Sequence, residues 1–149
     1  MIRAHLMLAD AAQAIAGKLY ILGGGWSVIV PGAPFAVAAK VEVPYDLATK
    51  HHEWSLELLD ADGEPFMIQQ GPNAEPTPLV SRDGFCTGIP AHVKPGIPLD
   101  HVIAVSVGPG LPLMPNSRYQ WRFSIDGRDD EDWCLGFSTT EVPQQLLAA

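Results

Sequence analysis

Alternation of apolar and polar residues with a period of two is the feature that most limits how this chain can fold. It is clearest from residue 118 to residue 126, where the odd positions are Tyr119, Trp121, Phe123 and Ile125 and the even positions are polar. Successive side chains of a β-strand point to opposite faces of its sheet, whereas a helix repeats every 3.6 residues. The segment is therefore predicted to be a strand with one aromatic face and one polar face.

Clusters of turn residues between such runs predict two β-hairpins. One hairpin joins residues 54–58 to residues 66–68 through a turn at residues 60–63, whose Asp-Gly pair tolerates positive φ. The other joins the aromatic strand to a second alternating run at residues 133–138 through an acidic loop at residues 126–132. Both hairpins indicate antiparallel pairing of neighbouring strands.

Further alternation predicts the remaining strands. The run at residues 35–43 stops at Pro44, which has no N–H to donate to a neighbouring strand. Residues 99–107 alternate in the same way. Shorter runs predict strands at residues 6–8, 19–21 and 26–28, which brings the total to about nine, and a further strand is expected at residues 85–89.

Residues 10–17 are the one helix-like stretch. Asp10 and Gln13 have the spacing of a capping box, alanines follow, and Gly17 would end the helix. Eight residues are marginal for a helix on its own. Fourteen prolines, many of them between the predicted strands, leave little room for longer helices elsewhere. We therefore predict at most one short helical turn.

Together these elements predict a single all-β domain over residues 1–149. Many short strands separated by turn residues indicate an antiparallel two-sheet β-sandwich of the immunoglobulin-like or Greek-key type. A barrel fits the same pattern. The sandwich is favoured because Trp54, Trp121 and Trp133 would fill the space between two packed sheets.

Charge and cysteine content limit the partners and the location. The chain has 9 basic and 17 acidic residues and a formal net charge of −8, so its long-range field repels nucleic acid and anionic membrane surfaces. No run approaches the ~20 apolar residues of a membrane span, and the N-terminus lacks the apolar core of a signal peptide. With only Cys86 and Cys134 as thiols, we expect a soluble cytoplasmic protein. We expect its partner to be another protein or a second copy of the chain.

The run of three glycines before Trp26 is the most conspicuous local motif. Phosphate-binding glycine loops precede a helix, whereas residues 27–30 have the composition of a strand. A glycine bulge or tight bend with Trp26 in the core is therefore favoured. The alternative is a backbone nest for an anion or a slot where a ligand meets the Trp26 ring. The candidate residues for a small-molecule site in the mouth between the sheets are Trp26, Arg82, His92 and His101.

No pattern assigns catalytic or metal-binding residues. His51 and His52 are adjacent and would point to opposite faces of a strand, and the His-x-His spacing typical of metal sites in small β-barrels is absent. The acidic loop lacks the ligand spacing of an EF-hand. No Gly-x-Ser-x-Gly motif occurs, and a dyad of Cys86 with His92 has no supporting pattern. We predict no metal and no cofactor, and a non-catalytic role is favoured over an enzyme.

Several short motifs resemble a known family. They are Ala9-Asp10-Ala11-Ala12-Gln13, Gly17-Lys18-Leu19, Ile21-Leu22-Gly23-Gly24-Gly25-Trp26, Tyr119-x-Trp121-Arg122 and Ile125-Asp126-Gly127. Taken together they are similar to a family of uncharacterised bacterial proteins known only as a domain of unknown function, over almost the whole chain. The resemblance implies a stand-alone β-rich domain and assigns no activity or catalytic residue.

A non-catalytic binding or assembly module is the leading hypothesis for function. Exposed strand edges and proline-rich loops would make its contacts, including contacts with another copy of the chain. A small-molecule or enzymatic site between the sheets is one alternative. A structural subunit of a larger assembly is the other, since β-sandwiches host all three kinds of function.

Overall fold

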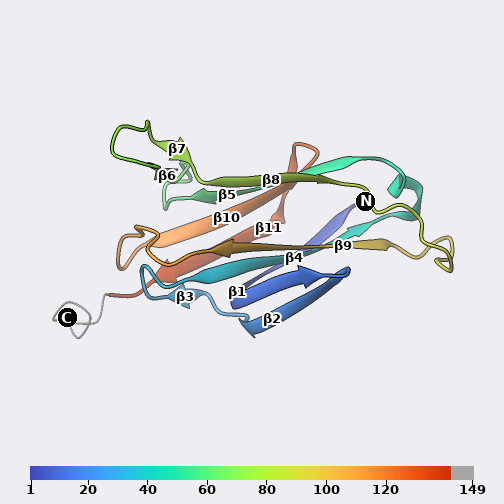
Figure 1. The fold of residues 1–149 in the computed structure, drawn as a ribbon, viewed down its shortest axis with the longest axis horizontal. Helices are drawn as coiled ribbons and strands as arrows, with labels where there is room; N and C mark the ends of the chain where they lie inside the picture. Colours follow the sequence, from blue (N-terminus) through green and yellow to red (C-terminus); the bar gives the residue numbers. More distant parts are fainter. Residues whose placement is uncertain (142–149) are drawn as a thin grey trace.

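Two β-sheets and a short two-stranded ribbon make up residues 1–141, the part of the chain that the computed structural model describes (Figure 1). The strands are β1 (Arg3–Ile15), β2 (Lys18–Gly24), β3 (Val28–Ile29), β4 (Phe35–Val43), β5 (His52–Leu59), β6 (Met67–Ile68), β7 (Thr77–Pro78), β8 (Val80–Phe85), β9 (Leu99–Val107), β10 (Arg118–Ile125) and β11 (Arg128–Thr139). The first sheet has the order β2-β1-β4-β9 and is antiparallel. The second has the order β3-β11-β10-β5-β8, and only β3 and β11 run parallel.

The all-β prediction is confirmed. Within residues 1–141 there is no α-helix, and one turn of 3₁₀ helix, η1 (Tyr45–Leu47), follows Pro44. No helix in this range is long and apolar enough to cross a membrane. Eleven strands stand where about nine are predicted, and three of them, β3, β6 and β7, are only two residues long.

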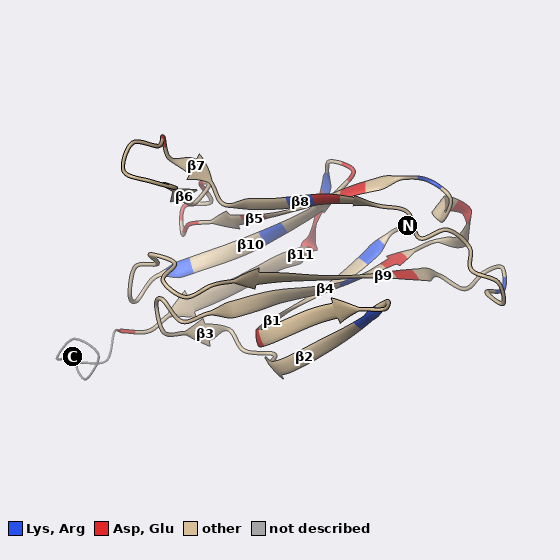
Figure 2. Ribbon diagram, viewed as in Figure 1, with Lys and Arg blue, Asp and Glu red and all other residues tan. Residues whose placement is uncertain are grey.

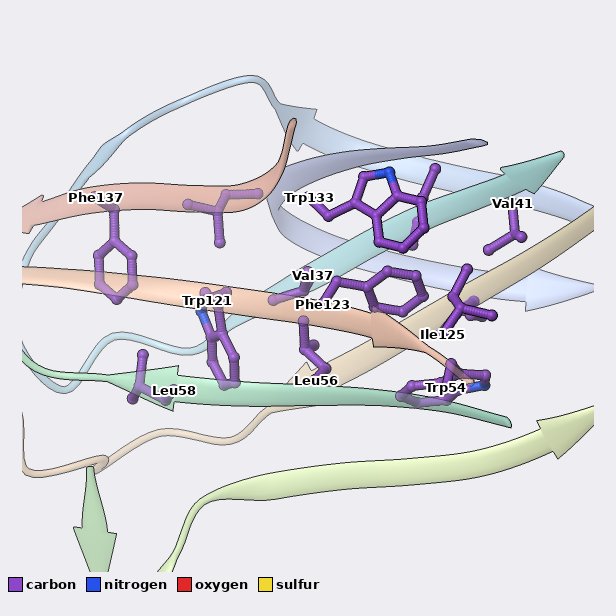
Figure 3. Close-up of a cluster of buried hydrophobic side chains, with 14 of the residues drawn as sticks. Val37, Val41, Trp54, Leu56, Leu58, Trp121, Phe123, Ile125, Trp133 and Phe137 are labelled. Carbon is purple, nitrogen blue, oxygen red and sulfur yellow. The ribbon is translucent and has the colours of Figure 1, made fainter. Parts of the chain in front are cut away.

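One hydrophobic cluster contains side chains from both sheets (Figure 3). Alternate residues of β4 enter it from the first sheet, where Phe35 packs edge-on against Trp121 of β10 at 6.2 Å between ring centroids. Trp54 and Trp133 are buried in the same cluster, as the alternation predicts. The two sheets therefore bury a shared apolar surface, which is the main stabilising contribution to such a fold.

The outer faces of the two sheets differ in chemistry. On the second sheet the even positions of β10 are polar: Arg122 pairs with Glu57 at 3.1 Å, and Ser124 and Ser55 share a hydrogen bond at 2.5 Å. This polar face is the one that the alternation predicts. On the first sheet, alanines occupy the outer face of β4, and Ala36 and Ala38 are almost fully buried there.

The helical turn predicted at residues 10–17 is wrong. β1 continues as a strand to Ile15, and Ala16 and Gly17 form a two-residue turn with φ of 51° and 75° before β2 begins. These angles suit the type I′ turn of a tight hairpin. Pairing with β2 and burial of Ala12 outweigh the weak helical preference of eight residues.

The hairpin at the end of the chain is confirmed, but its loop is shorter than predicted. The turn is only Asp126 and Gly127, at φ of 52° and 77°. The other residues of the predicted 126–132 loop belong to β11, where the pairing register with β10 shifts between Arg122 and Ser124. A β-bulge accommodates the extra acidic residues and keeps Trp133 in the core.

The hairpin predicted at residues 54–68 forms its turn, and the N–H of Phe66 donates to the carbonyl oxygen of Leu58 at 2.8 Å, but the second strand is only the two-residue β6, which does not pair along β5. The N–H of Gly63 donates to the carbonyl oxygen of Asp60 at 3.0 Å, and a single bridge joins Leu59 to Pro65. β5 then pairs with β10 and β8, while β6 pairs with β7.

The strand predicted at residues 85–89 is wrong. The strand in this part of the chain is β8, which ends at Phe85, where it pairs with His52.

Candidate functional site

The four residues proposed from the sequence for a small-molecule site lie in different parts of the fold. Trp26 lies between β2 and β3 and packs edge-on against Phe35 at 5.9 Å. His101, in β9, pairs with Val41 near the other end of β4. Six strand residues separate the positions of Phe35 and Val41, which corresponds to roughly 20 Å. Trp26 is partly buried against the core, a position that fits the packing interpretation of the glycine run.

Arg82 and His92 do not complete a cluster with His101. Arg82 is exposed on β8 and pairs with Ser55, whose side chain lies on the polar outer face of the second sheet. His92 is exposed in the connection between β8 and β9, at a φ of 80°. His101 instead stacks flat on Phe85, with ring centroids 4.2 Å apart. Within residues 1–141 no hydrogen bond or ring contact joins any two of the four.

His52 forms a buried contact with a turn far away in sequence. Its Nδ1 lies 2.7 Å from a carboxylate oxygen of Asp126, and its Nε2 lies 3.0 Å from the carbonyl oxygen of Leu47. Burial acts to lower the pKa of His52, but these hydrogen bonds and the Asp126 charge outweigh it, so the pKa is raised. The pKa of His101 is lowered by burial, against a smaller opposing effect of Asp83.

Residues that could hold a metal or act as nucleophiles are dispersed. Across residues 1–141, no group of three or more His, Cys, Asp or Glu side chains is placed to hold an ion. Cys86 and Cys134 are free thiols, and their hydrogen bonds run to the carbonyl oxygens of Ala48 and Asp130. His52 faces Asp126 and its neighbour His51 faces Glu53.

The feature that stands apart is the hairpin of residues 10–24, which we call the β1–β2 arm. Ala9 pairs with Gly24 and Ala11 with Leu22, but Asp10 and Gly23 between them are unpaired. Gly23 has a φ of 62°, and the Asp10 side chain lies over it. An irregularity of this kind bends a strand pair and increases its twist.

The bend turns the arm over the outer face of the first sheet. Before it, Leu8 of β1 points into the main core; after it, Ala12 packs on Ala36 and Ala38 of β4, on the opposite side of the sheet. Leu19 of β2 and Ala104 of β9 complete this second cluster. Figure 1 shows β1 and β2 below β4 and β9, on the side away from β5 and β8. Small alanine side chains allow the arm to lie close to the sheet.

One face of the arm remains exposed although most of its side chains are apolar; its polar residues are Gln13 and Lys18. Alternation places Ile15, Tyr20 and Leu22 on the side that points away from the sheet, and they are 51%, 54% and 71% exposed. We call these three residues the arm face. An open hollow of about 540 Å³ lies beside it, lined by residues 10–13, 20–22, 34–36 and 106–108. Large exposed apolar groups gathered in one place are typical of contact surfaces.

Among residues 1–141, β2 pairs on one side only, so it is an edge strand, and it lacks the usual protection of an edge. β8, the edge of the second sheet, carries Arg82 and Asp83 in mid-strand, and β9 keeps its large apolar side chains at least partly buried. β3 is too short to offer an edge. Beyond Lys18, β2 has no charged residue, and Figure 2 shows it in tan over that length. Charged residues on edge strands normally prevent pairing with other chains.

The glycine that bends the arm gives a testable prediction. Alanine at position 23 would need a left-handed φ of 62° and its Cβ would collide with the Asp10 carboxylate, whereas alanine at position 25 meets nothing at a φ of 95°. We expect Gly23→Ala to destabilise the fold by about 2 kcal/mol and Gly25→Ala by about 1 kcal/mol, measured by urea denaturation. In an Asp10→Ala background, the destabilisation by Gly23→Ala should fall to about that of Gly25→Ala. If the difference between the two variants stays the same in that background, the predicted collision with Asp10 is wrong.

Comparison with known families agrees with the sequence resemblance. The model of DUF6941, a family of unknown function, matches residues 4–135. The chain belongs to this family. The DUF6941 match spans the arm, both sheets and most of β11, so the elements described above lie inside the family's domain. No curated protein and no solved structure gives a significant match to the chain.

Sequence reasoning missed the arm, although one signal for it exists. Leu19, Tyr20, Ile21 and Leu22 are four consecutive apolar residues in a chain whose other strands mostly alternate. A short strand that is apolar on both faces is normally buried on both. In this member of DUF6941 the strand lies at an edge, so half of that apolar surface stays in contact with water.

Proposed function

We propose that this chain is a non-catalytic protein-binding or assembly module that makes contact through the β1–β2 arm. The observation that carries the proposal is the combination, in one short strand, of an unpaired backbone edge and large exposed apolar side chains. Exposed apolar surface is costly in water, and an unprotected edge invites pairing with other chains. A surface with both properties is best explained by a protein that covers it.

The alternative of a small-molecule site rests on Trp26, Arg82, His92 and His101. These residues lie at different ends and on different faces of the sheets, so no shared cleft among them supports it. Structural assembly into a larger particle would use the same kind of edge contact as the proposed module. Nucleic acid is disfavoured as the partner by the net charge of −8.

The scaffold that we propose for this module is one domain with a two-sheet β-sandwich of the immunoglobulin-like or Greek-key type. The hydrophobic cluster shared by both sheets supports this arrangement. A cytoplasmic location is also proposed, and the two free cysteines support it, because thiols stay reduced in that compartment.

A photo-crosslinking experiment tests whether the arm binds protein. A photoreactive phenylalanine derivative replaces Leu22 in the full chain, expressed in its native host cells. The matched control carries the same residue at Ile97, which is 57% exposed in the connection between β8 and β9, far from β2 in sequence. We expect covalent adducts with protein from position 22 and few from position 97. Equal or absent crosslinking at position 22 would overturn the proposal.

A further inference from the structure

We propose that the β1–β2 arm pairs with the arm of a second copy of the chain, β2 against β2, in an antiparallel arrangement with Tyr20 on the two-fold axis. This inference rests on the proposed function and names its partner. The pairing would join the two four-stranded sheets into one continuous sheet of eight strands. Four properties of the arm support it: its backbone, its side chains, its charge and its exposed area.

The backbone of β2 presents a self-complementary edge. Ile15 and Lys18 flank the two-residue turn, so they form the hydrogen-bonded pair that closes the hairpin. Because the pattern alternates, the N–H and C=O groups of Leu19 and Ile21 point away from β1, toward the open edge. A two-fold axis at Tyr20 places Leu19 opposite Ile21 of the second copy, and the reverse, which completes four backbone hydrogen bonds.

The side chains of the arm face also match themselves across this axis. Tyr20 lies opposite Tyr20 of the second copy in a non-hydrogen-bonded pair, where side chains approach most closely. Leu22 lies opposite Lys18 of the second copy, whose aliphatic stem can cover the leucine while its ammonium group stays in water. No position in this register sets one charge against a like charge.

Charge favours β2 over the other edges for contact between two copies. The whole chain carries a net charge of −8, so two copies repel each other on average. From residue 19 to residue 39 the sequence has no charged residue, and Lys18, at the start of β2, is positive. Each Lys18 would therefore approach a partner of opposite net charge. Pairing at β8, by contrast, would bring the water-exposed charges of both Arg82 and Asp83 of each copy into the contact.

The exposed area fits a weak, dissociable dimer. On β2 itself, Tyr20, Ile21 and Leu22 leave roughly 330 Å² of side-chain surface uncovered per copy, taking about 200 Å² for each complete side chain. With the backbone edges included, two copies would bury no more than about 1,000 Å² in total, which is in the range of transient interfaces. An obligate dimer would bury more, so we expect a reversible equilibrium.

Disulfide trapping of single-cysteine variants tests the pairing and its register. The variants are made in a Cys86→Ser, Cys134→Ser background. In the proposed dimer the two Tyr20 Cα atoms lie about 4.5 Å apart, within disulfide range, whereas the two Leu22 positions lie roughly 14 Å apart and out of range. Under mild oxidation, Tyr20→Cys should form covalent dimers about tenfold faster than Leu22→Cys or the remote control Ile97→Cys.

Light scattering supplies a readout that needs no cysteine. The unmodified chain should show an average mass that rises from monomer toward dimer with concentration. Ile21→Pro removes an N–H that points to the open edge and is not bonded to β1, so the fold should survive while dimerisation is lost. Circular dichroism and thermal unfolding of this variant check that it has folded.

The outcomes separate this inference from the proposed function. If Tyr20→Cys traps no faster than the two controls and the chain stays monomeric at high concentration, the self-pairing is wrong. If position 22 still crosslinks to other proteins in cells, the arm is a binding surface for a different protein and the proposed function stands. Trapping of Leu22→Cys as fast as Tyr20→Cys would also overturn the register, because it would indicate non-specific association.

Discussion

Replacing Phe123 by alanine is expected to lower the free energy of unfolding by about 3–5 kcal/mol. Phe123 is 1% exposed and lies between Trp54, at 6.0 Å between ring centroids, and Trp133, at 6.2 Å. The two tryptophans come from different strands, so they cannot both move into the space that the ring leaves. Equilibrium urea denaturation of both proteins measures the difference.

The control for this prediction lies three residues earlier on the same strand. Gln120 belongs to the polar face of β10, and its alanine variant should stay within about 0.5 kcal/mol of the unmodified chain. If Phe123→Ala does not fold, Phe123→Leu, with an expected cost of about 1.5 kcal/mol, keeps the comparison measurable. Equal costs at positions 120 and 123 would contradict the placement of Phe123 in the core.

The strands could be read from the sequence wherever one face is buried and the other meets water. In β10 the type of each residue indicates whether its side chain is buried or in water. Burial favours an apolar side chain at every second position, whichever strands lie beside β10. The odd positions of β4 enter the core in the same way, although the alanines on its outer face are also buried, under the arm. Turn residues located the hairpin of β10 and β11, since positive φ at Asp126 and Gly127 is a local requirement.

The arm and its edge could not be predicted in the same way, because they depend on contacts between distant segments. Residues 10–17 satisfy the local rules of a short helix, and only the burial of Ala12 on Ala36 and Ala38 decides otherwise. The run of four apolar residues that begins at Leu19 is apparent in the sequence. The position of β2 at an edge, however, follows only from the order of the strands in the sheet. Period-two alternation says which face is buried and not which strand is the neighbour.

Replacing His52 by glutamine is expected to cost about 2–3 kcal/mol at pH 5.5 and less as the pH rises. His52 is almost fully buried, packs on Phe85 at 5.5 Å, and bonds Asp126 and the Leu47 carbonyl oxygen. Glutamine keeps a polar group at the site but loses the ring and the positive charge. The part of the cost that comes from packing should not depend on pH, whereas the part that comes from the charge should.

The pH dependence has a definite sign because both partners have shifted pKa values. The pKa of His52 is raised above 6.5, so its charge stabilises the fold fully below that value and is lost as the pH rises through the folded-state pKa. Burial opposes ionisation of Asp126, but its hydrogen bonds with His52 and the Glu53 N–H lower its pKa below 3.8. The stability that Asp126 contributes is therefore present above pH 3.8 and is lost as the pH falls through its lowered folded-state pKa. The pair of His52 and Asp126 stabilises the fold most between about pH 4.5 and pH 6.

Urea denaturation at pH 5.5, 7 and 9 measures this dependence, with His51→Gln as the matched control. His51 is adjacent in sequence, its side chain is 65% exposed, and its nearest carboxylate, on Glu53, is 3.9 Å away. We expect His51→Gln to cost less than about 0.5 kcal/mol at every pH. NMR titration should find His101 losing its proton at lower pH than His52, since burial lowers the pKa of His101. A His52→Gln cost that is constant from pH 5.5 to pH 9 would mean that folding leaves the pKa of His52 unshifted, and a cost that rises with pH would mean that His52 is neutral in the folded chain. Either result would contradict a charged pair between His52 and Asp126.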